Sequence, residues 1–199
     1  MQYPKIFENL VEDFKKLPGV GEKTAERYAF IINSLPNEEI KKFSDDLINF
    51  KNNIKCCKIC GIITDHDICE ICDSKSRTNS IICVVEDSKN AYVFERSGNF
   101  NGKYHVLNGL INPIEDVNPE DINIFSLINK RINDEVKEVI IALSPSIEGE
   151  TTSLYIQKLL EKKNIKVSRL SYGIPLGSDI EYLDPMMISK ALEDRKYIE

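Results

Sequence analysis

The chain of 199 residues lacks any long hydrophobic run, and no apolar stretch approaches the roughly 20 residues that a membrane-spanning helix needs. Positive charge is also scarce, since 26 Lys and Arg stand against 32 Asp and Glu, a formal net charge of -6. This balance argues against nonspecific binding of nucleic acid by the whole surface, but it is compatible with a local basic site. The N-terminal segment MQYPKIFENLVEDF carries charges throughout and lacks a secretory pattern, which predicts a cytoplasmic protein that does not enter the membrane.

Three amphipathic helices are predicted in the first 54 residues. Apolar side chains recur at helical spacing over residues 5–14, again from Glu22, and again from about Asn37. In the third helix the apolar residues alternate steps of three and four, as in a heptad seam: Ile40, Phe43, Leu47, Phe50 and Ile54. Such a seam packs against another helix, either within the chain or in another subunit.

Four cysteines form two Cys-x-x-Cys pairs, Cys57/Cys60 and Cys69/Cys72, separated by eight residues. This spacing is typical of a structural zinc site, in which each pair supplies two thiolates at about 2.3 Å from the ion. The alternatives are two disulfides or cysteines that are merely buried. A reducing cytoplasm favours metal ligands instead. We therefore predict one structural zinc ion per chain, with no open position for a substrate.

Two neighbouring residues compete for a place in this site. Cys56 would form a Cys-x-x-x-Cys pair with Cys60, and His66 lies in the intervening loop. The strings CKICG and CEICD correspond to each other when Cys57 leads, which favours Cys57 and leaves His66 as a solvated loop residue. The sixth cysteine, Cys83, lies in the apolar run IICVV, which predicts a buried strand cysteine without a ligand role.

After residue 80 short β-rich runs alternate with helical stretches. The runs are IICVVE, YHVLNG, VKEVIIALS and IKVSRLS. The helical stretches lie near residues 87–96, 121–134 and 150–163. Strands that alternate with helices predict βαβ units and a mainly parallel sheet.

The string LPGVGEKTAERYA, between the first two helices, fails two phosphate-binding patterns. A Walker loop requires Gly-Lys, but Glu22 separates Gly21 from Lys23. A dinucleotide fingerprint requires a third glycine where Thr24 stands, and it should follow a strand. Nucleotide hydrolysis therefore has little support.

The same string fits a helix-hairpin-helix. In that motif Gly19 and Gly21 expose backbone amides that bind an anion together with the next helix N-terminus, while Val20 enters the core. Lys23 and Arg27 are four residues apart and share one helix face, so they can reach neighbouring phosphates of one nucleic-acid strand. The alternative is a plain helical hairpin with solvated basic side chains. The specificity of the full string favours contact with the DNA backbone.

The order of these parts resembles the RecR family of bacterial recombination mediators. The resemblance rests on the helix-hairpin-helix, the four-cysteine knuckle, CVVED and ALSPSIEGETT, and it covers essentially the whole chain. It implies an α/β multi-domain protein with a Toprim-like domain and a mainly parallel sheet, as in topoisomerases and DnaG-type primases, and a short helical C-terminal tail. The implied domains are a helical domain at 1–54, a zinc finger at 55–76, a Toprim domain at 80–175 and a C-terminal interface segment at 176–199.

Toprim enzymes hold Mg²⁺ with a glutamate that ends the first strand and an Asp-x-Asp that follows a later strand. Glu86 fits the first position, but Ser144 and Ser146 stand at the aspartate positions. A neutral hydroxyl is a poor ligand for a hard cation beside a carboxylate, so we expect no catalysis. Glu148 and Glu150 follow closely, and with Glu86 they are expected to form an acidic rim that serves a protein partner or holds Mg²⁺ weakly.

The resemblance implies a noncatalytic mediator of recombinational DNA repair. Such proteins form clamp-like rings of two to four subunits and bind single-stranded, gapped or duplex DNA without sequence specificity. With RecO-like and, in some bacteria, RecF-like partners they help RecA replace single-strand-binding protein. The alternative is a Toprim-type Mg²⁺-dependent nuclease or nucleotidyl transferase, which the missing Asp-x-Asp disfavours. A transcription factor that reads bases is weaker still, because the cysteine loop has no basic recognition helix.

Overall fold

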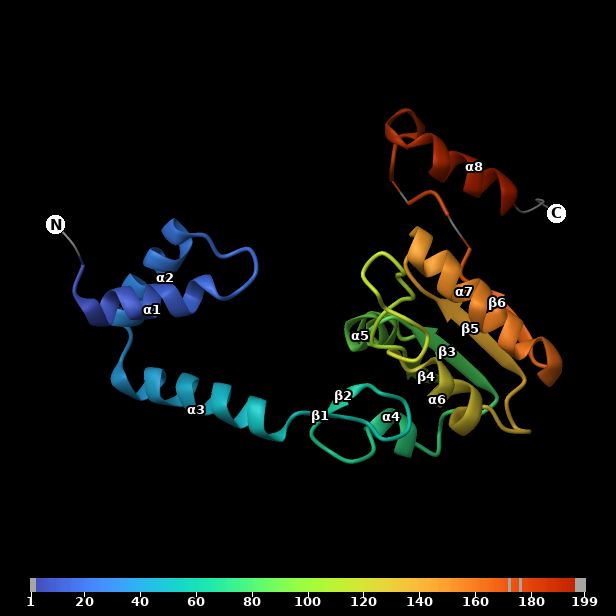
Figure 1. The fold of residues 1–199 in the computed structure, drawn as a ribbon, viewed down its shortest axis with the longest axis horizontal. Coiled ribbons are helices and arrows are strands. Elements are labelled where there is room, and N and C mark those ends of the chain that lie inside the picture. The colour runs from blue at the N-terminus through green and yellow to red at the C-terminus, as the bar shows by residue number, and fades with distance from the viewer. Residues whose placement is uncertain (1–2, 172, 176, 196–199) are drawn as a thin grey trace. The chain divides into compact units, whose positions relative to one another are not determined.

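The computed structural model describes residues 3–171, 173–175 and 177–195, and the chain divides into two compact units (Figure 1). The smaller unit is Met1–Ile54 and the larger unit is Lys55–Glu199. Among the described residues no helix combines the length and the apolar character that crossing a membrane requires.

The smaller unit is helical, as predicted. Its helices are α1 (Lys5–Lys15), α2 (Glu22–Ser34) and α3 (Asn37–Asn53). The first two pack together around the buried residues Val11, Ala25 and Ala29. The two alanines lie four residues apart on one face of α2, and their small side chains allow α1 to approach closely. Val20, from the hairpin between the helices, packs against the same cluster.

The third helix, α3, buries none of its residues. Phe43, Leu47 and Phe50 are 49%, 56% and 60% exposed. The heptad-like seam is therefore present on the helix, and the described residues leave it largely open.

A four-stranded parallel sheet organises the larger unit. Its strands are β3 (Ile81–Val85), β4 (Lys103–Val106), β5 (Glu138–Ala142) and β6 (Lys166–Arg169). They are arranged in the order β4-β3-β5-β6, and every neighbouring pair is parallel. After β3 the chain forms β4 on one side of that strand and then β5 on its other side, so the strand order reverses between β3 and β5. In open α/β sheets this reversal is where sites form.

Helices cover both faces of the sheet. The two longest are α5 (Ser88–Ser97) and α7 (Ile147–Leu160). Ile82 and Val84 of β3 share a core with Ile156 of α7. Cys83, between them in sequence, belongs to a second core with Ala91 of α5. Side chains of a strand alternate between faces, which explains this division and the near-continuous apolar run that predicted the strand.

The cysteine segment packs on β4, an edge strand of the sheet. It contains the antiparallel pair β1 (Lys55–Cys56) and β2 (Ile63–Thr64) and the short helix α4 (Glu70–Asp73). The Val106 backbone N–H donates to the carbonyl oxygen of Cys60 at 2.7 Å. Gly61 has φ +80°, and a Cβ there would lie 3.0 Å from the Val106 carbonyl oxygen. The knuckle therefore covers part of the exposed edge of the sheet.

The remaining elements are α6 (Ile124–Ser126), the π-helical turn η1 (Leu127–Arg131), the short 3₁₀ segments η2 (Glu161–Lys163) and η3 (Ile180–Tyr182), and α8 (Pro185–Glu193). The helix predicted near residues 121–134 is shorter in the structure, where α6 and η1 together cover 124–131. The helical spacing arose because Ile124, Leu127 and Ile128 are buried in this short segment. At α8 the Asp184 carboxylate accepts the N-terminal hydrogen bond from the Met187 N–H, which begins the predicted C-terminal helix.

Candidate metal centre and nucleic-acid interface

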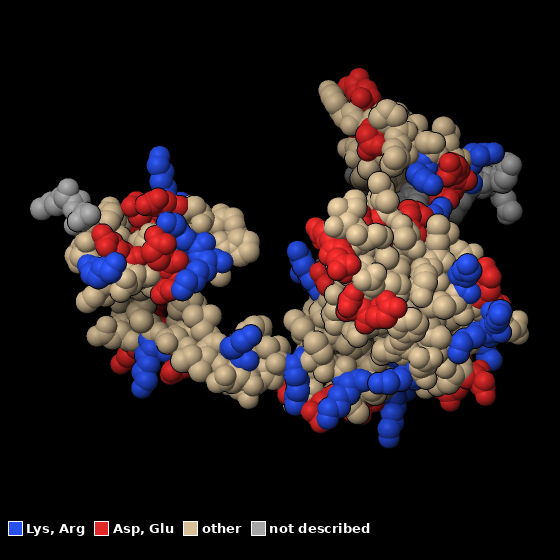
Figure 2. Space-filling view, in the orientation of Figure 1, with Lys and Arg blue, Asp and Glu red and all other residues tan. Residues whose placement is uncertain are grey.

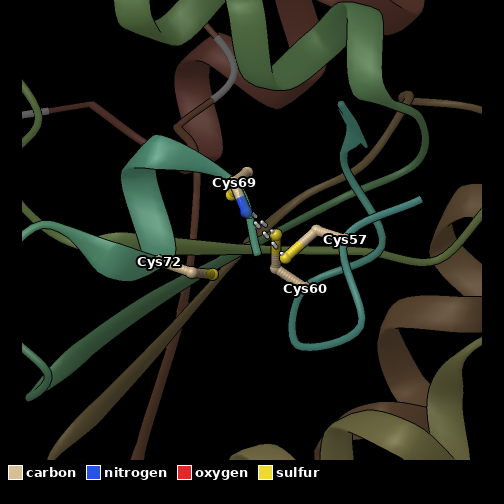
Figure 3. A group of neighbouring side chains, drawn as sticks. All are labelled: Cys57, Cys60, Cys69 and Cys72. Atoms are coloured by element: carbon tan, nitrogen blue, oxygen red, sulfur yellow. Dashed lines mark hydrogen bonds between the residues drawn. The ribbon is translucent and has the colours of Figure 1, made fainter. Parts of the chain in front are cut away.

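The four predicted metal ligands, Cys57, Cys60, Cys69 and Cys72, are buried together (Figure 3). Their sulfurs all lie within 4.8 Å of one another, and the Cys60 and Cys69 sulfurs are 3.6 Å apart. Sulfurs placed tetrahedrally at the usual zinc–sulfur bond length are separated by about 3.8 Å. The group therefore has the donor set and the size to bind one metal ion.

Local backbone hydrogen bonds shape the site. The Cys57 N–H donates to Ile62 O at 2.7 Å, and the Gly61 N–H donates to Cys57 O at 2.9 Å, which closes a tight turn around the first pair. The second pair begins at Cys69, which is the N-cap residue of α4, and Cys72 follows within this one-turn helix. The Cys69 N–H also donates to the Cys57 sulfur at 3.4 Å and links the two pairs.

The other candidate ligands lie outside this group. Cys56 is exposed in β1, and His66 is exposed beside Asp65. Cys83 is buried in β3, where burial raises the pKa of its thiol to about 12. The structure thus brings Cys57 rather than Cys56 to the other three sulfurs.

Hydrogen bonds between the cysteines shift the pKa values of two thiols in opposite directions. Bonding to Cys69 raises the pKa of Cys60, and bonding from Cys60 lowers the pKa of Cys69. The thiolate is the form that coordinates a metal, and binding a divalent ion would favour deprotonation of these thiols.

The glycine hairpin leaves its backbone open. Gly19 has φ +79°, a conformation that favours glycine, and the Val20 N–H closes the turn on Leu17 O at 3.1 Å. Gly21 is the N-cap residue of α2, and no side chain in the described ranges forms a capping hydrogen bond there. Apart from each glycine's own neighbours in the chain, the described residues place no heavy atom within 4 Å of where a Cβ would lie at either glycine. Backbone amides at this helix start can therefore be approached closely by an anion.

Lys23 and Arg27 are exposed on the first turns of α2. Among the described residues neither forms an ion pair, so both charges are available to a ligand. The Arg27 guanidinium lies 5.7 Å from the centre of the Tyr28 ring, close enough for a cation–π contact.

Two further lysines, Lys15 and Lys16, lie at the C-terminal end of α1, just before the hairpin. The sequence analysis did not identify them as candidate site residues. Lys15 pairs with Glu12 at 2.8 Å, and Lys16 pairs with Asp13 at 2.7 Å. The pKa of Lys15 is raised first by its hydrogen bond to Glu12, and the Glu22 carboxylate adds to the effect. Their position directly before a glycine turn is the sequence feature that could have identified them as candidates. Both lysines are thus paired, and acidic and basic side chains intermingle on the smaller unit (Figure 2). Of the residues that the structure describes, Lys23 and Arg27 therefore carry the clearest unpaired positive charge at the hairpin.

The predicted acidic rim lies at the point where the strand order reverses. Glu86 follows β3 and Ser144 follows β5, so the two meet although they are 58 residues apart. The Ser144 hydroxyl donates to Glu86 Oε2 at 2.5 Å. Both line an open hollow of about 510 Å³. Figure 2 shows acidic side chains gathered on the visible face of this unit.

The start of α7 also borders this hollow. The Ser146 hydroxyl accepts a hydrogen bond from the Gly149 N–H at 3.1 Å and caps the helix. The pKa of Glu148 is lowered by its own backbone N–H and then by the Ser146 hydroxyl. Any side chain at Gly149 would collide with the Ser144 carbonyl oxygen, which explains the glycine.

The third acid of the predicted rim is directed elsewhere. Glu150 forms an ion pair with Arg169 of β6 at 3.3 Å. The structure thus brings Glu86 and Glu148 to one hollow and places Glu150 outside its lining.

Comparison with protein families gives three matches along the chain. A helix-hairpin-helix model of RecR matches residues 7–50, and a Toprim domain model matches 80–171. A RecR C-terminal model matches residues 173–196. The chain belongs to the RecR family. The predicted family resemblance and fold class are both confirmed.

The RecR matches place each described site in a family context. The hairpin with Lys23 and Arg27 falls in the RecR helix-hairpin-helix, the hollow at Glu86 falls in the Toprim domain, and α8 falls in the RecR C-terminal region. Family membership supports a RecR-type role in recombinational repair and DNA binding. The four-cysteine cluster adds a site that can bind a metal ion.

Proposed function

We propose that this RecR-family chain is a noncatalytic recombination mediator that binds the DNA backbone without sequence specificity. Together with a RecO-like protein, and in some bacteria a RecF-like protein, it would help load RecA on gapped or single-stranded DNA. The observation that carries the proposal is the hairpin before α2. There Gly19 and Gly21 leave the backbone open, and α2 follows with Lys23 and Arg27, two cations that form no ion pair within the described part of the chain.

This arrangement suits phosphate rather than bases. An uncapped helix N-terminus attracts negative charge, and its amides can donate to phosphate oxygens. Lys23 and Arg27, one turn apart, can then contact adjacent phosphates of the same strand. Phosphate contacts position a protein on DNA but carry no sequence information.

The absence of catalysis is supported by the contact between Glu86 and Ser144. In a Toprim enzyme both positions would carry carboxylates that hold Mg²⁺. Here a hydroxyl occupies the second position and donates to the remaining carboxylate, so a lone pair that a cation would need is already engaged. The rim formed by Glu86 and Glu148 is better suited to a protein partner.

We propose zinc as the metal of the four-cysteine group, one ion per chain with a structural role. Four thiolates and tetrahedral spacing suit zinc, and a closed set of protein ligands leaves no position for a substrate. The proposed domains are the helical domain 1–54, the zinc finger 55–76, the Toprim domain 80–175 and the C-terminal interface segment 176–199, in a cytoplasmic protein.

We also propose a ring of two to four subunits. The open seam of Phe43, Leu47 and Phe50 on α3 supports this proposal, because an apolar stripe of this spacing is typical of a helix that packs on another helix. A ring also explains how a chain of net charge -6 holds DNA: only its inner face need be basic, and several hairpins act together.

The test uses a labelled gapped duplex, zinc-loaded protein and Mg²⁺, and it measures binding and strand cleavage in one sample. Lys23→Glu with Arg27→Glu should abolish most binding, whereas wild-type protein should bind and leave the DNA intact. Lys41→Glu with Lys51→Glu is the matched control, because both lysines are exposed on α3 and the charge change is the same.

Equal loss of binding in the two double variants would show that only net charge matters and would refute the hairpin assignment. Strand cleavage that disappears on Glu86→Gln would refute the noncatalytic role. Binding that is retained in both variants would place the DNA site elsewhere.

A further inference from the structure

A buried lysine lies against the cysteine cluster. Lys103, the first residue of β4, is only 8% exposed, and its ammonium donates to the Cys72 carbonyl oxygen at 2.9 Å. No carboxylate among the described residues lies within ion-pair distance of it. A buried charge without an opposite charge is costly, so this ammonium requires negative charge from another source.

The cluster can supply the missing negative charge when it holds a divalent metal. Four thiolates carry four negative charges and the ion carries two positive ones, which leaves two negative charges in a buried site. Lys103 supplies a positive charge beside it. Two disulfides would be neutral and would leave this cation uncompensated.

We propose that Lys103 is a charge-compensating residue that raises the affinity of the four-cysteine site for its divalent metal. The proposal rests on the metal assignment made above and extends it to a residue outside the knuckle, on β4. It follows that metal binding couples the knuckle to the sheet through charge as well as through packing.

The test measures zinc affinity of the full chain by competition with a chromophoric chelator at one neutral pH. Lys103→Met should weaken zinc binding by about tenfold to hundredfold, the usual effect of losing a partner of the metal ligands. Lys137→Met is the matched control, because its ammonium also donates to a backbone carbonyl, that of Asp134, but is exposed. It should bind zinc as wild type does.

Lys103→Arg and Lys103→Gln separate charge from hydrogen bonding. Arginine should restore affinity, whereas glutamine should not, because it can donate to the Cys72 carbonyl but carries no charge. Full rescue by glutamine, or wild-type affinity in a folded Lys103→Met protein, overturns the proposal. Should Lys103→Met fail to fold, the comparison of Lys103→Gln with Lys103→Arg decides by the same criterion. A wild-type chain that binds no zinc overturns the metal assignment itself, and this proposal with it.

Discussion

The salt dependence of DNA binding tests most directly whether the hairpin contacts DNA phosphates. Replacing Lys23 and Arg27 by alanine removes two exposed charges that have no ion pair among the described residues. Neither side chain is buried, so the fold should survive the change. The two residues are predicted to neutralise one phosphate each, in every subunit that contacts the DNA.

The expected magnitude follows from counterion release. Each phosphate contact contributes about 0.9 to the slope of log K against log salt on duplex DNA, and about 0.7 on a single strand. The double variant should therefore lose about 1.8 slope units on duplex for each engaged subunit. Two engaged subunits give a loss of about 3.6 and four give about 7, so the same experiment counts the hairpins that touch DNA.

The assay is fluorescence anisotropy with a labelled duplex and a labelled single strand over a series of salt concentrations. Lys41→Ala with Lys51→Ala is the control of equal charge change. An unchanged slope in the hairpin variant would refute the reasoning, even if affinity fell, because lost affinity with a constant slope indicates damage other than lost phosphate contacts.

Three further predictions concern the larger unit. Cys72→Ser should abolish stoichiometric zinc binding and lower stability by about 4 kcal/mol or more, whereas Cys56→Ser should leave zinc content and melting unchanged; normal zinc content in the first variant would shift the ligand assignment. Ser144→Asp with Ser146→Asp should create a Mg²⁺ site, so Mg²⁺ should raise the melting temperature of this variant and not of wild type. An equal rise in both proteins would mean that the serines do not prevent Mg²⁺ binding. The buried imidazole of His105 has its pKa lowered from 6.5 to about 4, so the unfolded chain binds its proton first. Its contribution to stability is present above pH 6.5 and falls by up to about 3 kcal/mol as the pH drops towards 4, and denaturant unfolding of His105→Gln over that range should show a shallower dependence.

Much of the local structure follows from the sequence because helices and strands bury side chains at characteristic periods. Apolar spacing placed α1, α2 and α3, and apolar runs placed the four strands of the parallel sheet. The cysteine spacing indicated a knuckle because both pairs are local turns. The helix expected near residues 121–134 was too long, since burial of Ile124, Leu127 and Ile128 produces the same spacing in a much shorter segment.

By itself, then, the sequence determined the order of the parts, the four sulfur ligands as candidates, the glycine hairpin with Lys23 and Arg27, and the serines at the acid positions. Only the tertiary structure decided which distant side chains meet. Strand order brings Ser144 to Glu86 and carries Glu150 to Arg169. The packing of the knuckle on β4 buries Lys103 against Cys72, 31 residues away. The physical reason is that local periodicity records which face of an element is buried, whereas strand order and register set what that face is buried against.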